Sequence, residues 1–259
     1  MIPKDFKTET TSIWSFPVRG KWATHNAKYR GNFAPQVARN LILKYSSENE
    51  WILDPMVGSG TTLIEAKLLK RNAIGIDINP FAIDLSKKAI DFDFKNSTAS
   101  QIVRLGDARK LDEIADSSMD LIIFHPPYLN IIQYSKGKIK EDLSNISNVD
   151  EFFKEIEVVA KELFRVLKPN KFCAVLIGDT RKAQHYVPLS YFLLKTFLQS
   201  NFVLKEEIIK IQHNCTYSKR WEDNAQKWGF FLIMHEHLFV FRKPAENESL
   251  TKIKWSSKI

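Results

Sequence analysis

Residues 50–62 read Glu50-Trp-Ile-Leu-Asp54-Pro-Met-Val-Gly58-Ser-Gly60-Thr-Thr62, an apolar run that ends in a carboxylate and passes into a glycine loop. The run from Glu50 to Asp54 has the length and composition of a short buried strand. Apolar side chains recur at helical spacing from Thr61 to Arg71, which predicts a helix directly after the loop. A buried strand, a glycine loop and a helix in this order are typical of a parallel α/β sheet.

The rest of the chain continues this alternation. Further strands are expected at 73–77, 102–105, 119–124 and 172–177, helices at 79–90, 150–168 and 189–198, and a final pair of strands at 203–211 and 230–241. Strands that alternate with helices form a parallel sheet covered on both faces. The sequence therefore predicts an α/β fold with a single doubly wound, mostly parallel sheet of about seven strands and an antiparallel hairpin at one edge. Ligands of such sheets bind at the carboxyl ends of the strands.

The length and composition fit one globular domain spanning residues 1–259. Of the 259 residues 44% are hydrophobic, yet no apolar run approaches the roughly 18 residues that a membrane span needs. Residues 1–10 carry charges without an apolar core, so we expect neither a secretory signal nor a transit peptide. Two cysteines, Cys173 and Cys215, are too few for a disulfide framework or a zinc site, which favours a reducing, cytoplasmic location.

The charge of the chain is positive and unevenly distributed. There are 38 Lys and Arg residues against 30 Asp and Glu residues, which gives a net charge of +8. Residues 10–47 contain six basic residues and no acid, and two further acid-free basic stretches occur at 130–140 and 180–205. A nucleic-acid backbone is a partner that fits this charge, and a mildly basic solvated surface is an equally good interpretation.

The glycine loop has the features of a ligand-binding turn. Gly58 and Gly60 let the backbone approach a ligand closely, and Thr61 or Thr62 can cap the helix behind them. A plain strand-to-helix turn is the alternative interpretation of so short a match. The Lys-Ser/Thr ending of a phosphate loop is missing, which disfavours nucleoside triphosphate hydrolysis.

Carboxylates follow the next two strands. Asp77 comes 17 residues after Gly60 and can accept hydrogen bonds from both hydroxyls of a ribose. Asp107 follows the third strand, where a carboxylate can accept from an adenine amino group. Each acid taken alone is also a common cap or turn residue. Together, polar groups at three strand ends predict a cofactor that contains ribose and adenine.

The loop after the fourth strand holds the most specific motif of the chain, His125-Pro126-Pro127-Tyr128. Two adjacent prolines fix the backbone in an extended form, and neither has an N–H to donate. Tyr128 can stack on a nucleobase, while the His125 side chain and the Pro126 carbonyl can accept hydrogen bonds from its exocyclic amino group. A structural proline turn with a buried tyrosine is the alternative interpretation.

These motifs, in this order, resemble those of the S-adenosylmethionine-dependent amino-methyltransferases of DNA, which modify adenine at its 6-amino or cytosine at its 4-amino group. The resemblance extends from about Trp22 to Lys243. It implies S-adenosylmethionine as the cofactor, with the glycine loop at its methionine end, Asp77 at its ribose and Asp107 at its adenine. It also implies that the basic segment 1–49 closes over the cofactor. The cofactor-binding residues implied in this way are Asn32, Phe33, Asp54, Gly58, Gly60, Thr61, Thr62, Asp77 and Asp107.

His125 stands where members of that family usually carry Asp, Asn or Ser. A neutral imidazole can accept the hydrogen bond of an amine through its unprotonated nitrogen, whereas a protonated one cannot. The choice between adenine and cytosine therefore stays open. Our hypothesis is direct transfer, in which the catalytic residues His125, Pro126, Pro127 and Tyr128 hold the amine while its nitrogen attacks the sulfonium methyl group in line.

A target base inside a duplex must be flipped out before this chemistry can occur. Residues 129–149 and 212–229 combine basic, amide and aromatic side chains, and we expect them to contact DNA over a short recognition sequence. A cognate restriction endonuclease is an expected partner, and no membrane is. His235 and His237 flank Glu236, but no third ligand follows at suitable spacing, so no metal is expected.

Two alternatives belong to other functional classes. The first is the same chemistry on RNA or on a protein amide, because a Pro-Pro-Tyr turn can grip any planar amine. The second is a catalytically inactive nucleic-acid binder that keeps the fold, with His125 as the residue that abolished activity.

Overall fold

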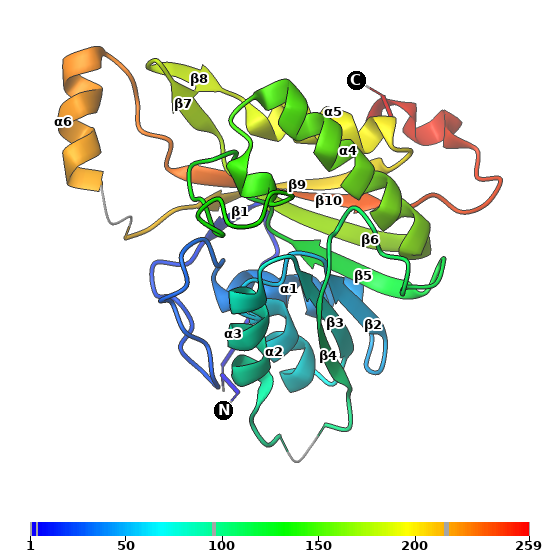
Figure 1. Ribbon diagram of the computed structural model, residues 1–259. Coiled ribbons are helices and arrows are strands. Elements are labelled where there is room, and N and C mark those ends of the chain that lie inside the picture. The colour runs from blue at the N-terminus through cyan, green and yellow to red at the C-terminus, as the bar shows by residue number, and fades with distance from the viewer. Residues whose placement is uncertain (1, 4, 95–96, 215–217, 259) are drawn as a thin grey trace.

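The computed structural model describes residues 2–3, 5–94, 97–214 and 218–258. Within them, eight strands form one sheet in the order β1-β9-β10-β6-β5-β2-β3-β4, and two more form a separate hairpin (Figure 1). All neighbours in the sheet are parallel except β10, which runs antiparallel to β6 and β9. The strands of the sheet are β1 (Ile13–Ser15), β2 (Trp51–Asp54), β3 (Asn72–Asp77), β4 (Gln101–Leu105), β5 (Met119–Phe124), β6 (Leu167–Ile177), β9 (Val203–Ile211) and β10 (His235–Arg242). The hairpin consists of β7 (Thr180–Lys182) and β8 (His185–Val187).

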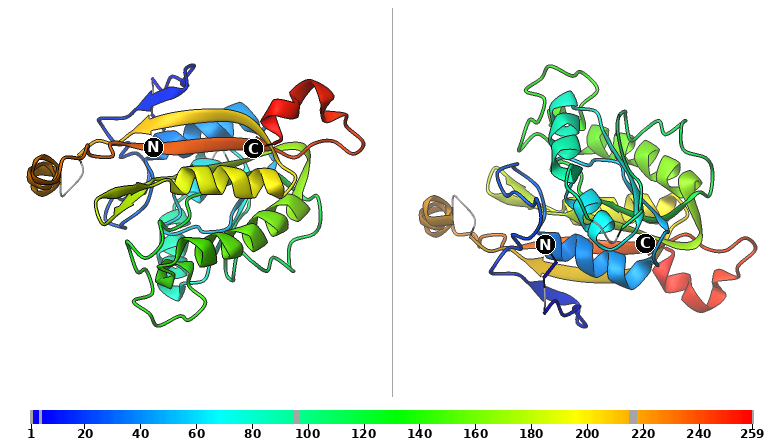
Figure 2. Two further views of the ribbon diagram at one scale, coloured as in Figure 1. Left: turned by 90° about the horizontal axis from the view of Figure 1, so that it is seen from above. Right: turned by 90° about the horizontal axis from the view of Figure 1, so that it is seen from below.

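Helices cover both faces of the sheet. One face carries α1 (Pro35–Tyr45), α2 (Thr61–Leu68) and α3 (Pro80–Ile90), and the other carries α4 (Val149–Val166) and α5 (Leu189–Gln199) (Figure 2). Helix α6 (Ser218–Trp228) projects away from this body beside the β7–β8 hairpin, whereas the short 3-10 helix η2 (Leu250–Ser256) lies at the opposite end. A further 3-10 turn, η1 (Leu143–Asn145), precedes α4. None of the helices in this described part of the chain is long and apolar enough to span a membrane.

The central strands are largely apolar because both of their faces are buried. All six residues of β5 are buried. Ile122 packs in the core beneath α4 and α5, while its neighbours Leu121 and Ile123 pack in the core beneath α1 and α2. Side chains of a strand alternate between faces, so each central strand must supply apolar groups to two cores. Polar side chains are consequently displaced to the strand ends.

The predicted fold class is confirmed, and the strands expected at 119–124 and 203–211 coincide with β5 and β9. The sheet has one strand more than the expected seven, because β1 pairs with β9 outside the antiparallel pair. The antiparallel pair β9–β10 therefore lies next to the edge of the sheet and not at the edge itself. The sequence did not predict β1, because its three residues are too few to show an alternation of apolar and polar side chains.

Several element ends differ from the prediction, and two of the differences have a clear physical consequence. Pro169 was expected to end the helix of residues 150–168, but α4 ends at Val166 and Pro169 lies inside β6. The proline falls within an irregularity of the pairing between β5 and β6, where its missing N–H breaks no regular hydrogen-bond ladder. The last strand begins at His235 rather than at Phe230, and Phe230, Leu232, Ile233 and Met234 line a cavity described below.

We expect Phe241→Ala to lower the free energy of unfolding by about 3–5 kcal/mol, the usual cost of truncating a buried phenylalanine. Phe241 is fully buried, and its ring stacks on Phe197 at a centroid distance of 4.7 Å. Phe81→Ala is the matched control, because Phe81 is 62% exposed and its loss should change stability by no more than about 0.5 kcal/mol. Urea denaturation followed by circular dichroism measures both, and equal effects would contradict this description of the core.

Candidate functional site

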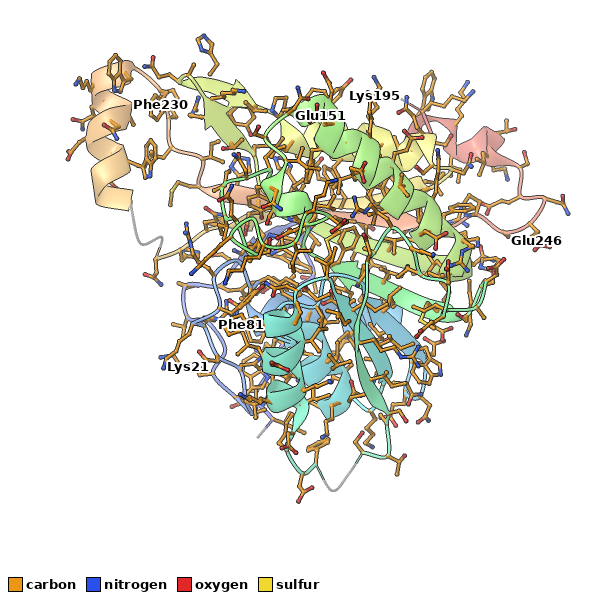
Figure 3. The ribbon with its side chains drawn as sticks, viewed as in Figure 1. Lys21, Phe81, Glu151, Lys195, Phe230 and Glu246 are labelled. Atoms are coloured by element: carbon orange, nitrogen blue, oxygen red, sulfur yellow. The ribbon has the colours of Figure 1, made fainter. Side chains whose placement is uncertain are left out.

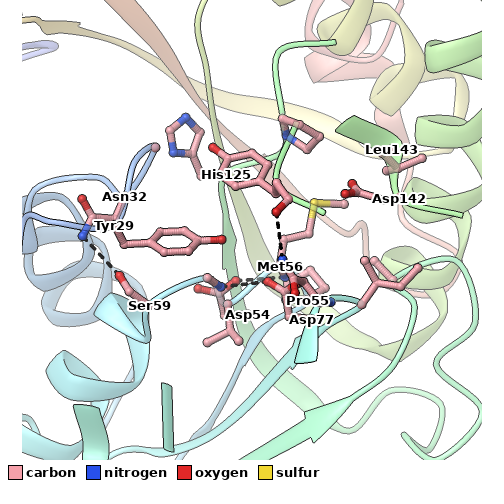
Figure 4. Close-up of a pocket in the computed structure, with 18 of the residues that line it drawn as sticks. Tyr29, Asn32, Asp54, Pro55, Met56, Ser59, Asp77, His125, Asp142 and Leu143 are labelled. Atoms are coloured by element: carbon pink, nitrogen blue, oxygen red, sulfur yellow. Dashed lines mark hydrogen bonds between the residues drawn. The ribbon is translucent and has the colours of Figure 1, made fainter. Parts of the chain in front are cut away.

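A cavity lies at the carboxyl ends of the parallel strands. Asp54 ends β2, Asp77 ends β3, Asp107 follows β4 and His125 follows β5, and all four residues line it. In Figure 4, Asp54 and Asp77 enter this cavity from the strand ends, whereas Tyr29 reaches it from the N-terminal segment. The predicted set of strand-end residues thus meets at one place.

The glycine loop gives α2 an unusual beginning. Gly60 is the N-cap residue of α2 and has a φ of +83°, a conformation that favours glycine. The prediction that Thr61 or Thr62 caps the helix is wrong, because the N-cap has no side-chain hydrogen bond and the Thr62 hydroxyl donates to Asp54 instead. The N–H groups at the start of α2 consequently stay without a side-chain cap. They form a site where an electron-rich ligand group is stabilised.

Asp54 is a buried carboxylate with few partners. Its Oδ2 accepts from Thr62 Oγ1 at 2.5 Å, and its Oδ1 accepts from the Met56 amide at 3.1 Å. Burial raises the pKa of Asp54 to about 7, and the nearby Asp77 adds to the increase, although the two hydrogen bonds oppose it. This carboxyl therefore titrates near neutral pH, and a positively charged ligand would stabilise its ionised form.

Asp77 is held in place by the backbone. Its Oδ2 accepts from the Gly58 amide at 3.0 Å and its Oδ1 from the Asn79 amide at 2.9 Å. Burial raises the pKa of Asp77, while the backbone hydrogen bonds lower it. Each carboxylate oxygen keeps a further lone pair, so Asp77 can still accept from ligand hydroxyl groups.

Asp107 lines the same cavity but is paired with Arg109. The Arg109 Nε lies 3.0 Å from each carboxylate oxygen of Asp107, and Nη2 lies 2.6 Å from Oδ2. Arg109 also contacts Glu155 and donates to the Glu141 carbonyl at 2.7 Å. The sequence reasoning did not anticipate this clamp, although an Arg two residues after a strand-end acid is a signal that could have indicated it.

The N-terminal segment forms one wall of the cavity. Asn32 and Phe33 line it, as does Tyr29, and the Asn32 amide donates to Ser59 Oγ at 3.2 Å (Figure 4). The Tyr29 ring stacks on that of Tyr134 at 5.8 Å. The open space is only about 100 Å³, whereas small-molecule sites usually measure about 300–1,000 Å³. A ligand of cofactor size therefore needs more room than this conformation provides.

The same segment is anchored to α2 through one buried carboxylate. Glu65 Oε1 contacts Trp22 Nε1 and His25 Nε2, both at 2.6 Å, and Oε2 accepts from Arg39 at 2.7 Å. Glu65 is fully buried. Because a buried charge requires partners, this arrangement fixes residues 22–25 against the helix behind the glycine loop.

A second, wider cavity of about 700 Å³ adjoins the first. Gly31, His125 and Tyr134 line both cavities, while Pro126 and Tyr128 line only the second and Pro127 only the first. The structure therefore brings the four residues of the proline turn to the boundary between the two cavities, as the direct-transfer hypothesis requires.

The turn is supported from behind by residues that the sequence reasoning did not assign to the site. The Tyr128 ring packs against Gly178, where an added Cβ would lie 2.6 Å from it. Tyr128 Oη lies 2.5 Å from His125 Nε2 and donates to Glu236 Oε1 at 2.8 Å. Lys210 donates to Glu236 Oε2 at 2.6 Å. Glu236 shares a strand face with Leu238 and Val240, so a carboxylate at an otherwise apolar position was the available signal.

The far wall of the second cavity consists of residues that lie outside the main sheet. It is lined by Trp221 of α6, by Phe230 and by Gln212, which directly follows β9. The Arg181 guanidinium lies 4.7 Å from the Phe230 ring and donates to the Phe231 carbonyl at 2.7 Å. Figure 3 shows Phe230 between α6 and the β7–β8 hairpin.

The remaining candidates have structural surroundings. Among the residues that the structure describes, no three His, Cys, Asp or Glu side chains form a metal-binding group. His237 Nδ1 instead lies 2.8 Å from Glu207. Cys173 is buried within β6, and Cys215 lies outside the described residues.

The DNA methylase family model matches residues 3–88 and 119–258. The chain belongs to the DNA methylase family. This confirms the resemblance on which the sequence prediction rested. The match includes the glycine loop, Asp77 and the proline turn, while Asp107 falls between the two matched ranges.

Several methyltransferases are similar to parts of this chain. The Type II methyltransferase M.MjaII of Methanocaldococcus jannaschii is 31% identical over 142 residues, 49% of this chain and 26% of that protein. M.MthZI of Methanothermobacter thermautotrophicus is 36% identical over 127 residues, 40% of this chain and 36% of that protein. The matches thus span between a quarter and somewhat over a third of these relatives. A tRNA (guanine(10)-N2)-dimethyltransferase of Pyrococcus abyssi is 32% identical over 95 residues, 36% of this chain and 28% of that protein.

Solved structures share the fold of this family member. A SAM-dependent methyltransferase of Methanosarcina mazei superimposes with a TM-score of 0.56 at 18% identity, over 79% of this chain and 97% of that chain. The [4+2]-cyclase SpnF superimposes equally well, with a TM-score of 0.56 at 15% identity over 83% of this chain and 85% of that chain. Because the second protein is described as a cyclase, this likeness identifies the fold and not the reaction.

We expect Asp54→Asn to remove part of the pH dependence of stability. The folded pKa of about 7 exceeds the ordinary value of 3.8, so the stabilising contribution of the protonated carboxyl is present below pH 4 and is lost as the pH rises to 7. Between pH 5 and pH 8 the natural protein should therefore lose about 2–3 kcal/mol more unfolding free energy than the variant. Urea denaturation at both pH values measures this difference, and parallel curves would contradict it.

We expect Glu65→Ala to loosen the N-terminal segment. Removal of one partner from a buried ion pair usually costs about 3–5 kcal/mol, and trypsin should cleave the variant faster at Lys21 and Lys28. Glu48→Ala is the control, since Glu48 is exposed and pairs with Lys70 at 3.7 Å, an interaction worth at most about 1 kcal/mol. Cleavage at the natural rate in both variants would refute the anchoring role.

Proposed function

We propose that this chain is a DNA amino-methyltransferase that transfers a methyl group from S-adenosylmethionine to the exocyclic amino group of adenine or cytosine in DNA. The observation that carries the proposal is the position of His125, which lines both cavities and follows β5 directly. A methyl donor in the first cavity and a base in the second would meet at this residue.

The residues of the first cavity fit the cofactor. The carboxylates of Asp77 and Asp107 suit ribose hydroxyls and an adenine amino group, and Asp54 suits the positively charged end of its methionine part. Gly58 and Gly60 form a cradle in which any Cβ would be strained or crowded, because both have positive φ and Gly58 lies under the Tyr29 ring. When bound, S-adenosylmethionine supplies a methyl group on a positively charged sulfur atom.

The chain's own residues would hold the accepting amine. Burial lowers the pKa of His125, and the nearby Lys210 lowers it further, while Glu236 and a backbone contact with Gly31 oppose this decrease. A neutral imidazole can accept a hydrogen bond from the amino group, and the carbonyl of Pro126 can accept another. Both contacts increase the electron density on the amine nitrogen and hold the amino group in position. Orientation and electrostatics therefore supply the rate enhancement.

The second cavity would receive the flipped base. Its lining by Tyr128, Trp221 and Phe230 offers aromatic faces, on which bases stack in a sequence-tolerant way. Segments 129–149 and 212–229 border this cavity and are our candidates for DNA contacts. The basic segment 1–49 is our candidate for closure over the cofactor, because Tyr29, Asn32 and Phe33 form a cavity wall.

The similar proteins suggest a partner protein and two candidate nucleic-acid substrates. Several are Type II methyltransferases, and on this ground we include a cognate restriction endonuclease as the proposed partner. The similarity to a tRNA methyltransferase makes RNA the second candidate substrate. We also propose a cytoplasmic location, because the low cysteine content favours a reducing compartment.

The deciding experiment is transfer of labelled methyl from S-adenosylmethionine to unmethylated genomic DNA, followed by digestion to nucleosides and mass spectrometry. Methylated adenine or methylated cytosine supports the proposal and identifies the target amine. If the protein labels tRNA offered in the same assay but does not label DNA, the proposed substrate becomes RNA instead of DNA. Binding of the cofactor without transfer to DNA, RNA or protein would leave the inactive binder, and lack of cofactor binding would refute the enzyme proposal.

We expect His125→Ala to lower the methyl-transfer rate by at least about 10²-fold, the typical contribution of a positioned proton acceptor. His125→Asn is the matched control, since its amide oxygen can accept the same hydrogen bond, and it should keep more activity than the alanine variant. Calorimetry should find that both variants still bind the cofactor, because Asp77 and Asp107, which we assign to its ribose and adenine, are unchanged. Equal rates in all three proteins would exclude this role.

A further inference from the structure

Four side chains form one hydrogen-bonded row behind the proline turn. His125 Nε2 lies 2.5 Å from Tyr128 Oη, Tyr128 Oη lies 2.8 Å from Glu236 Oε1, and Lys210 Nζ lies 2.6 Å from Glu236 Oε2. Glu236 and Lys210 are direct cross-strand partners on β10 and β9. Their side chains are only 8% and 15% exposed. The sheet register therefore fixes this pair in place.

The direction of each hydrogen bond follows from the number of protons available. Lys210 can only donate, and an ionised Glu236 can only accept. The single hydroxyl proton of Tyr128 is used for Glu236, so Tyr128 Oη must accept from His125 Nε2. A neutral imidazole carries one N–H. His125 consequently holds its proton on Nε2 and has a bare lone pair on Nδ1.

The opposite nitrogen is the unusual atom of the site. His125 Nδ1 is buried and has no partner in regular hydrogen-bond geometry among the residues that the structure describes, although a backbone contact with Gly31 raises the pKa of the ring. A buried acceptor without a donor costs free energy, and orphaned polar atoms of this kind require an explanation. An amino group that enters from the second cavity would supply the missing donor.

We propose that Lys210 and Glu236 are positioning residues which, through Tyr128, hold His125 in the Nε2–H tautomer and so present Nδ1 as the acceptor for the methylated amine. The identity of that amine rests on the proposed function, whereas the tautomer does not. The amine hydrogen donates to Nδ1 in the ground state, which orients the nitrogen lone pair toward the methyl group.

The same row also accommodates the proton that the reaction releases. Transfer forms a nitrogen–carbon bond and breaks the sulfur–carbon bond, whose electron pair stays on sulfur, and the new ammonium nitrogen then gives one proton to Nδ1. The resulting imidazolium lies 3.9 Å from Glu236, measured from Nε2 to Oε1. A nearby carboxylate stabilises such a charge without taking the proton itself.

The charged and titratable groups around His125 agree with these protonation states. Although burial raises the pKa of Glu236, Lys210 and His125 lower it below its ordinary value. Burial and the Glu236 charge raise the pKa of Tyr128, so its hydroxyl stays protonated. Arg30, Tyr134 and Arg181 are the other charged or titratable residues that line the second cavity.

The tautomer can be read directly by ¹⁵N NMR of protein labelled at its six histidines, with the His125 signals assigned by their loss in His125→Asn. In the natural protein we expect a protonated Nε2 and an unprotonated Nδ1. In Glu236→Gln, Lys210 needs the Gln carbonyl, so the Gln NH₂ group faces Tyr128 and the phenol must donate to His125 Nε2. The proton should then move to Nδ1, and methyl transfer should fall by at least about 10²-fold.

A second substitution tests the direction of the row. In Glu236→Gln combined with Lys210→Glu, the new carboxylate accepts from the Gln NH₂ group, and the Gln carbonyl can again accept from Tyr128. We expect the Nε2–H tautomer to return and the rate to recover to within about tenfold of the natural protein, an outcome that a merely structural role would not produce. Glu207→Gln is the matched control, since Glu207 also lies on β9 and pairs with a histidine, and it should change neither the His125 signals nor the rate.

The outcomes separate this proposal from the proposed function. A natural protein with Nδ1 protonated, or a Glu236→Gln variant with unchanged tautomer and rate, overturns the positioning role. If the tautomer shifts as expected but no nucleic acid is methylated by the natural protein, the row is supported and the proposed function fails.

Discussion

The site depends on one constraint, which is that the central parallel strands are buried on both faces. A strand between two helical layers has no solvent-facing side on which to place a polar group. Asp54, Asp77 and His125 therefore stand where β2, β3 and β5 end, and Asp107 follows the end of the edge strand β4. Because these strands are neighbours in the sheet and run in one direction, their ends form a single polar edge.

This constraint explains which parts of the site were readable in the sequence. The strand-end residues follow apolar runs directly, so locating the strands located Asp77 and His125 as well. Glu236 and Lys210 could not be placed in this way, because their contact with the proline turn depends on the pairing of β9, β10 and β6 across long stretches of chain. The same holds for β1, whose strand conformation exists only because the edge of β9 is available.

The two cavities differ in how they treat buried charge. In the first, Asp54 and Asp77 lie close together with only backbone and hydroxyl partners, and burial raises the pKa of both. That arrangement destabilises the folded protein near neutral pH and is relieved by a cation, which makes it a feature of a binding site. Behind the second cavity, Glu236 is fully paired with Lys210 and Tyr128. That arrangement is a rigid support, and rigidity is what an oriented acceptor needs.

The pairing of Glu236 also accounts for the histidine at position 125. Tyr128 has a single hydroxyl proton, so it can donate either to Glu236 or to the residue at position 125, but not to both. A carboxylate at 125 would compete with Glu236 for this proton, and two such charges repel at this burial. Histidine resolves the conflict because it donates to Tyr128 through one nitrogen and still offers an acceptor through the other. The departure of residue 125 from the usual family residue and the buried carboxylate at 236 are therefore two parts of one hydrogen-bonding arrangement.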